Sequence, residues 1–67
     1  MLEPGDVVKI KPEYLDVKED PDFLYLVVGV SDSRVKIFYK TENSALGGIE
    51  TVSDYMLEKV SHVDISK

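Results

Sequence analysis

Cysteine and tryptophan are absent from the 67 residues of this chain, and histidine occurs once, as His62. Without thiols the chain can form neither a disulfide nor a thiolate-bound zinc site, a composition typical of a reducing compartment. One histidine leaves no second imidazole for a histidine metal site, and a catalytic triad is not suggested either. We therefore expect no catalytic residues, no metal, no cofactor and no enzymatic activity, and we expect His62 to be an ordinary surface side chain.

Positive charge is also scarce, since thirteen acidic residues outnumber eight basic ones and give a net charge of −5. This balance disfavours non-specific binding to nucleic-acid phosphates. The longest apolar run, Leu24 to Val30, has seven residues and is too short to cross a bilayer. The N-terminus lacks the basic and apolar regions of a signal peptide. These observations predict a soluble, cytoplasmic protein with no membrane partner.

The β-branched, aliphatic and aromatic residues that are present fall into five short segments with strand-like patterns. The predicted strands are residues 5–10, 23–31, 35–40 and 49–52, and a final strand that ends at Val60. Ser53-Asp54 can cap one helical turn before that last strand, and Leu57 is assigned to the turn. Residues 61–67 are polar and are predicted to form a tail. The sequence therefore predicts one domain, residues 1–60, and a C-terminal tail, residues 61–67.

The second and third strands flank the polar triplet Asp32-Ser33-Arg34 and are predicted to form a hairpin. A two- or four-residue turn gives a single register, in which one face pairs Val30 with Val35, Val28 with Ile37 and Leu26 with Tyr39. The other face then pairs Gly29 with Lys36, Val27 with Phe38 and Tyr25 with Lys40. We expect the first face to be buried, apart from Tyr39, and Lys36 and Lys40 to be exposed.

Two loops interrupt these strands. The first, Glu13 to Asp22, carries five acidic residues and one lysine, and Pro12 and Pro21 bracket it. Tyr14 and Leu15 are apolar residues within it, and they either anchor the loop on the domain or contact a ligand. The second loop, 41–48, ends in Gly47-Gly48, and this pair is predicted to form a turn.

The order of strand, long loop, hairpin, short strand, helical turn and final strand resembles that of SH3-like barrels over residues 5–60. The opening GDVVKI is similar to the start of KOW modules, although Lys11-Pro12-Glu13-Tyr14 stands where those modules have spaced glycines. The chain also resembles small acidic barrels encoded by bacteria and phages. These resemblances imply an all-β fold, a five-stranded SH3-like barrel with one short 3-10 or helical turn before its last strand, and they imply no mechanism.

A non-enzymatic protein-interaction module is the function that these features favour. A partner with a basic segment would bind the long acidic loop and the adjoining aromatic side. The predicted contact residues are Tyr14, Asp16, Glu19, Asp20, Asp22, Tyr25 and Phe38. The alternative is a nucleic-acid-associated module that uses the face of Lys9, Lys36, Lys40, Tyr25 and Phe38. A continuous positive surface around the three lysines favours nucleic acid, and dilution of that charge by Glu50 and Asp6 favours protein.

Overall fold

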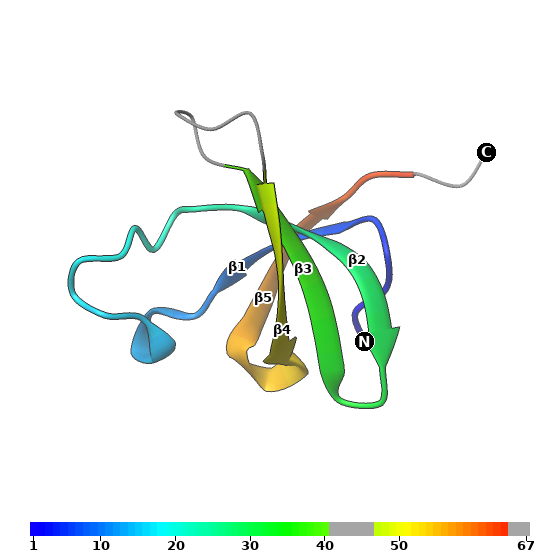
Figure 1. Ribbon diagram of the computed structural model, residues 1–67, viewed down its shortest axis with the longest axis horizontal. Helices are drawn as coiled ribbons and strands as arrows, with labels where there is room; N and C mark the ends of the chain where they lie inside the picture. The colour runs from blue at the N-terminus through cyan, green and yellow to red at the C-terminus, as the bar shows by residue number, and fades with distance from the viewer. Residues whose placement is uncertain (41–46, 65–67) are drawn as a thin grey trace.

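The structure, a computed structural model, describes residues 1–40 and 47–64. Within these residues five strands form one antiparallel sheet. The strands are β1 (Asp6–Ile10), β2 (Tyr25–Ser31), β3 (Arg34–Lys40), β4 (Gly47–Ser53) and β5 (Leu57–His62). They lie in the order β4-β3-β2-β1-β5, so the first strand lies between the second and the last (Figure 1). The predicted all-β class with five strands is confirmed.

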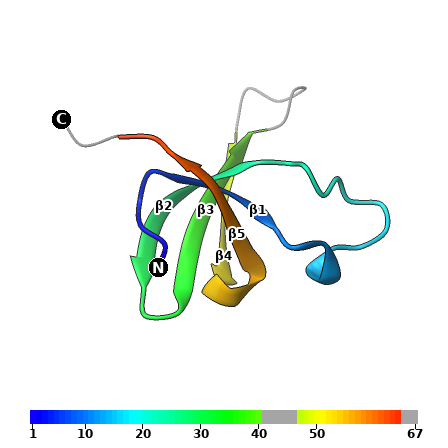
Figure 2. The ribbon, with the colours of Figure 1, turned by 180° about the vertical axis from the view of Figure 1, so that it is seen from behind.

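The sheet curls but does not close, because β4 and β5 stand at the two ends of the strand order. β4 is nearest the viewer in Figure 1, whereas β5 is nearest in Figure 2. Two 3-10 turns accompany the sheet, η1 (Pro12–Tyr14) and η2 (Asp54–Met56). The predicted turn before the last strand is therefore confirmed as η2, whereas η1 falls where a plain loop was expected.

The core lies on one face of the curled sheet, here called the inner face. Its buried apolar side chains are Val8, Ile10, Val27, Val35, Ile37 and Leu57. Strand side chains alternate between faces, so each strand that contributes to this set presents every second residue to the opposite, outer face. Leu15 packs against the same core from the long loop, which anchors that loop on the sheet.

A bulge in β2 corrects the predicted register of the hairpin. Val30 pairs with Val35 and Gly29 with Lys36, as predicted, but Val27 pairs with Ile37 because the register shifts between Val27 and Gly29. Val28 is the extra residue of the bulge. Val27 is fully buried, while Val28 and Val30 are each 40% exposed. The predicted burial of Val28 and Val30 is therefore wrong, Leu26 is only half-buried, and Val35 and Ile37 are buried as predicted.

A second register shift, between Val7 and Val8, changes the assignment of the last strand. Val7 pairs with Ser61 and Val8 with Lys59, which leaves Val60 as the extra residue, 51% exposed. Leu57 is the first residue of β5 and is buried, so it belongs to the strand and not to the helical turn. The prediction that Val60 is a core residue is wrong for the same reason.

The last strand extends beyond the predicted boundary at Val60. Ser61 and His62 belong to β5, and the N–H of Val63 donates to the carbonyl of Gly5 at 2.7 Å. Gly5 has a φ of 99°, a left-handed conformation that favours glycine, and its own N–H donates to the carbonyl of Val27 at 2.9 Å. This glycine therefore joins three segments: the entry to β1, β2 and the end of β5. Ile65 to Lys67, the rest of the predicted tail, lies outside the described residues.

Candidate functional site

A groove of about 300 Å³ opens at the end of the sheet where the long loop enters β2 (cyan in Figure 1). Three of its lining side chains are aromatic, two are carboxylates and one is aliphatic. We call it the aromatic groove; its residues are Ile10, Glu19, Phe23, Tyr25, Tyr39 and Glu50. The four strands β1 to β4 supply one residue each, and the long loop and the segment before β2 supply the other two.

Strand alternation explains why two tyrosines meet in this groove. Tyr25 lies two residues before Val27, and Tyr39 lies two residues after Ile37, so both follow the inner face beyond the end of the core. Glu50 joins them because it pairs directly with Ile37 across β3 and β4. The groove is thus a continuation of the core in which tyrosine and glutamate replace aliphatic side chains.

The three rings contact one another edge to face. The ring centroids of Phe23 and Tyr25 are 5.0 Å apart at an interplanar angle of 71°. Those of Tyr25 and Tyr39 are 6.2 Å apart at 73°. Both geometries are favourable for aromatic pairs, and Tyr25 is the central ring.

A pair of glycines makes room for aromatic rings on both faces of β4. A Cβ atom at Gly48 would lie 2.6 Å from Cζ and Oη of Tyr39, and one at Gly47 would lie 2.6 Å from Cζ of Phe38. These rings therefore lie where other residues would carry side chains. The prediction that Gly47-Gly48 forms a turn is wrong, because both residues belong to β4 and pair with Lys40 and Tyr39.

The groove has a negative electrostatic character. Burial raises the pKa of the Tyr25 hydroxyl, and the carboxylates of Glu50 and Glu19 and the neighbouring Tyr39 raise it further. Glu19 is held in place by the N–H of Asp16, which donates to Glu19 Oε1 at 2.8 Å. A site with this charge and these rings is suited to a cation.

The long loop brings only part of the predicted contact set to the groove. Tyr25 and Glu19 line it. Tyr14 instead contacts Tyr55 of η2, with ring centroids 5.8 Å apart. Asp16 and Asp20 act locally, since Asp16 Oδ1 accepts the N–H of Val17 at 2.8 Å and Asp20 Oδ1 accepts the N–H of Asp22 at 2.9 Å. Like these two, Asp22 is exposed on the loop and does not line the groove.

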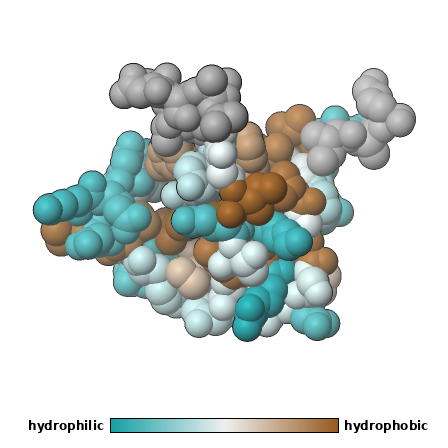
Figure 3. Space-filling view, in the orientation of Figure 1, coloured by the Kyte–Doolittle hydropathy of each residue, from teal (hydrophilic) through white to brown (hydrophobic). Residues whose placement is uncertain are grey.

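Phe38 lies on the outer face, so the predicted grouping of Phe38 with Tyr25 is wrong. Leu26 and Ile49 are its direct cross-strand neighbours. Phe38 is 36% and Ile49 61% exposed. The surface seen in Figure 3 has an apolar area near β4 bordered by hydrophilic side chains. The bulge at Val28 explains why Phe38 and Tyr25 do not lie on one face as predicted, because it moves Tyr25 to the face opposite Phe38.

Three chemically important groove residues are not among those predicted from the sequence: Phe23, Tyr39 and Glu50. Tyr39 was assigned to the correct face, but the uniform register placed it opposite Leu26. Glu50 was considered only as a charge that could dilute the lysines. A register in which Val27, not Val28, faces Ile37 would have put Tyr25 and Tyr39 on one face.

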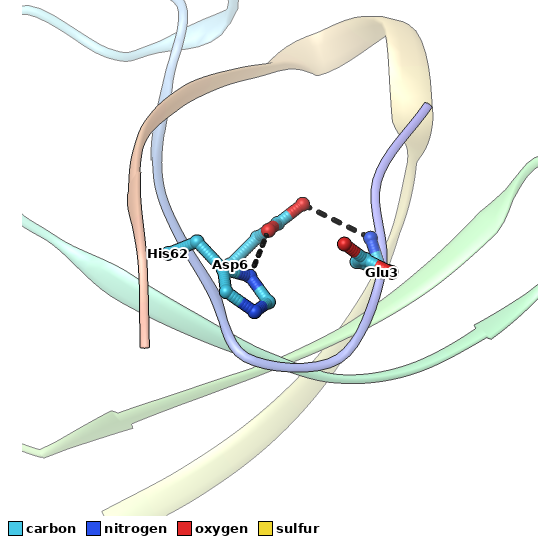
Figure 4. A group of neighbouring side chains, drawn as sticks. All are labelled: Glu3, Asp6 and His62. Atoms are coloured by element: carbon cyan, nitrogen blue, oxygen red, sulfur yellow. Dashed lines mark hydrogen bonds and ion pairs between the residues drawn. The ribbon is translucent and has the colours of Figure 1, made fainter. Parts of the chain in front are cut away.

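A second group of polar side chains surrounds the fully buried carboxylate of Asp6 at the start of β1 (Figure 4). Asp6 Oδ1 lies 2.7 Å from His62 Nδ1 and 3.4 Å from Lys59 Nζ, while Oδ2 accepts the N–H of Glu3 at 3.0 Å. Burial by itself raises the pKa of Asp6, but the contacts with His62, Glu3 and Lys59 outweigh it, and the pKa lies below its ordinary value. His62 is therefore more than an ordinary surface side chain.

Ligand-type atoms of Glu3, Asp6 and His62 lie within 4.8 Å of one another, the spacing of a metal site. However, the Asp6 carboxylate already accepts three donors, and the Lys59 ammonium at 3.4 Å would repel a cation. The arrangement therefore fits an ion-pair network that fastens β5 and the N-terminal segment to β1.

Comparison with protein-family models, with curated proteins and with solved structures finds no match to this chain. Among the residues that the structure describes, no helix has the length and apolar character needed to cross a membrane. The site with the most specific chemistry in the described chain is the aromatic groove.

Proposed function

We propose that this chain is a non-enzymatic protein-interaction module that binds a basic segment of a partner protein in the aromatic groove. The observation that carries the proposal is the convergence of three rings and two carboxylates on one opening of about 300 Å³. The proposal needs no metal or cofactor. It includes a cytoplasmic location, which the absence of cysteine supports.

A lysine or arginine side chain suits the groove through both its charged group and its aliphatic stem. Its charged group would interact with the faces of Tyr25 and Tyr39 and with the carboxylates of Glu19 and Glu50. Cation–π contacts of this kind contribute about 0.5–2 kcal/mol, with the higher values in desolvated sites. The aliphatic stem of the same side chain would pack on Phe23 and Ile10.

The remaining loop acids have a separate role in this proposal. Asp16, Asp20 and Asp22 are exposed beside the groove and do not line it. Exposed charges outside a contact mainly increase the rate of association and its dependence on salt. We therefore propose that they steer a basic partner toward the groove.

The proposal assigns this curled, open sheet to the SH3-like barrel architecture. It is supported by the strand order β4-β3-β2-β1-β5, by the β2–β3 hairpin and by the single turn η2 between β4 and β5. The N–H of Lys11 donates to the carbonyl of Met56 at 2.9 Å, which holds η2 against the end of β1. In this arrangement the aromatic groove is one open end of the barrel.

A labelled peptide of alternating lysine and alanine, titrated by fluorescence anisotropy, tests the proposal. Glu50→Gln and Glu19→Gln should each weaken binding about two- to fivefold, as expected for loss of one partly exposed charge. Glu58→Gln is the matched control, because Glu58 is an exposed acid on β5 outside the groove. Equal losses for all three variants, or equal binding of a glutamate peptide, would refute binding in the groove.

A further inference from the structure

A second hollow, of about 190 Å³, lies on the outer face over β2, β3 and β4. Gly29, Val30, Ser31, Arg34, Lys36 and Thr51 line it. Gly29 pairs with Lys36, and Lys36 pairs with Thr51, so these three residues form one row across the sheet. Ser31 and Arg34 form a neighbouring pair. The hollow thus lies on the opposite face from the aromatic groove.

The hollow exists because Gly29 has no side chain. A Cβ atom at this position would lie 3.9 Å from Cβ and Cδ of Lys36, an ordinary contact distance. Neither the backbone angles nor a steric clash therefore requires glycine here. A larger residue would fill the space beside the Lys36 side chain.

The chemistry of this hollow is that of an anion site. Arg34 and Lys36 are exposed cations, and within residues 1–40 and 47–64 neither forms an ion pair. Ser31 and Thr51 add hydroxyl donors, and no lining residue is acidic. Guanidinium, ammonium and hydroxyl groups are the donors that phosphate oxygens accept. Asp32 precedes Arg34 by two residues in the hairpin turn, and Asp54 follows Ser53, the cross-strand partner of Arg34. Lys36 lies farther from both acids along the strand and is therefore the more strongly positive end of the hollow.

An apolar row lies next to this hollow on the same face. It consists of successive cross-strand neighbours on four strands: Val7, Leu26, Phe38 and Ile49. Phe38 follows Lys36 by two residues, a spacing of about 7 Å along a strand. That spacing is of the order of the distance from a phosphate to the base of one nucleotide. An exposed ring at this distance can stack on a base.

We propose that the outer face binds single-stranded nucleic acid, with a phosphate in the hollow at Gly29 and a base on Phe38. The charges named in the sequence analysis as diluting the lysines do not lie there, because Glu50 is on the inner face and Asp6 is buried. Tyr25 is not part of this site. The site is independent of the aromatic groove, and its ligand has the opposite charge.

Anisotropy of a labelled eight-nucleotide single strand, measured at several salt concentrations, tests this proposal. Lys36→Ala and Arg34→Ala should each weaken binding and reduce the salt slope by about 0.7, the value expected per phosphate contact in a single strand. Phe38→Ala should weaken binding about tenfold through loss of stacking. Lys18→Ala, an exposed lysine on the long loop, is the matched control and should leave affinity nearly unchanged.

Filling the hollow provides a further variant whose charge is unchanged. Gly29→Val should weaken oligonucleotide binding severalfold while circular dichroism shows a folded protein, and Gly29→Ala is the smaller step of the same series. The proposal is overturned if Lys18→Ala and Lys36→Ala have equal effects, if Gly29→Val binds normally, or if phosphatidylserine vesicles bind and the oligonucleotide does not. Glu50→Gln should not weaken oligonucleotide binding, so failure here is distinguishable from failure of the groove proposal.

Discussion

Phe38 and Tyr39 are adjacent in the sequence, yet they belong to two surfaces of opposite chemistry. Tyr39 points into the groove with Glu19 and Glu50, whereas Phe38 lies on the outer face, two residues from Lys36. Strand alternation separates the charges as well as the rings. A net charge of −5 therefore describes neither surface, because two carboxylates line the groove, whereas Arg34 and Lys36 on the outer face form no ion pair within the described residues.

The largest expected effect concerns Val27, the buried residue next to the bulge at Val28. Val27 is fully buried and Val28 is 40% exposed, although they are neighbours. Val27→Asp should abolish folding, because a buried carboxylate without a partner costs several kcal/mol in a domain of low total stability. Val28→Asp should fold with a thermal midpoint within a few degrees of the original. Thermal melts followed by circular dichroism provide the test, and equal losses for both variants would contradict the bulge.

This comparison also shows how much of the fold could be predicted from the sequence. Alternating residues around Asp32-Ser33 identify the hairpin, and they correctly assign Val35 and Ile37 to the core. The bulges at Val28 and Val60 depend on how the sheet curls, which local patterns do not encode. One bulge was enough to move Tyr25 to the other face and to separate it from Phe38.

Contacts between distant residues were equally inaccessible from sequence. His62 and Asp6 are 56 positions apart, and nothing local to either residue indicates their pairing. Gly47-Gly48 has the composition of a turn, and only the rings that lie against it explain its place in β4. Of the groove, Glu19 and Tyr25 could be predicted, because the loop acids and the aromatic strand were both visible in the sequence.

A smaller effect is expected from Gly48→Ala, which should impair one of the two surfaces and leave the other intact. Its Cβ would collide with the Tyr39 ring, and overpacking of this kind commonly costs about 1–3 kcal/mol. Displacement of Tyr39 should weaken basic-peptide binding and leave oligonucleotide binding unchanged. Gly29→Ala is the matched control on the outer face, and it should not affect the peptide. A Gly48→Ala protein that binds the peptide normally would show that Tyr39 is not part of the site.

The smallest effect concerns Asp6, which joins the strands and belongs to neither surface. Its pKa in the folded chain lies below its ordinary value of 3.8, so folding favours the ionised form. The associated stability is present above that value and is lost as the pH falls through the lower folded pKa. The thermal midpoint should therefore decrease as the pH is lowered through this acidic range, and the decrease should be smaller in Asp6→Asn. An unchanged pH profile in Asp6→Asn would mean that the network does not stabilise the ionised carboxylate.

The separation of the two surfaces is tested most directly by mapping amide chemical shifts of the ¹⁵N-labelled protein with each ligand in turn. The basic peptide should shift Phe23, Tyr25, Tyr39 and Glu50, and the oligonucleotide should shift Gly29, Lys36, Phe38 and Thr51. Each set should remain responsive when the other ligand is already bound. Overlapping sets, or displacement of one ligand by the other from the same residues, would contradict the assignment of opposite ligands to opposite faces.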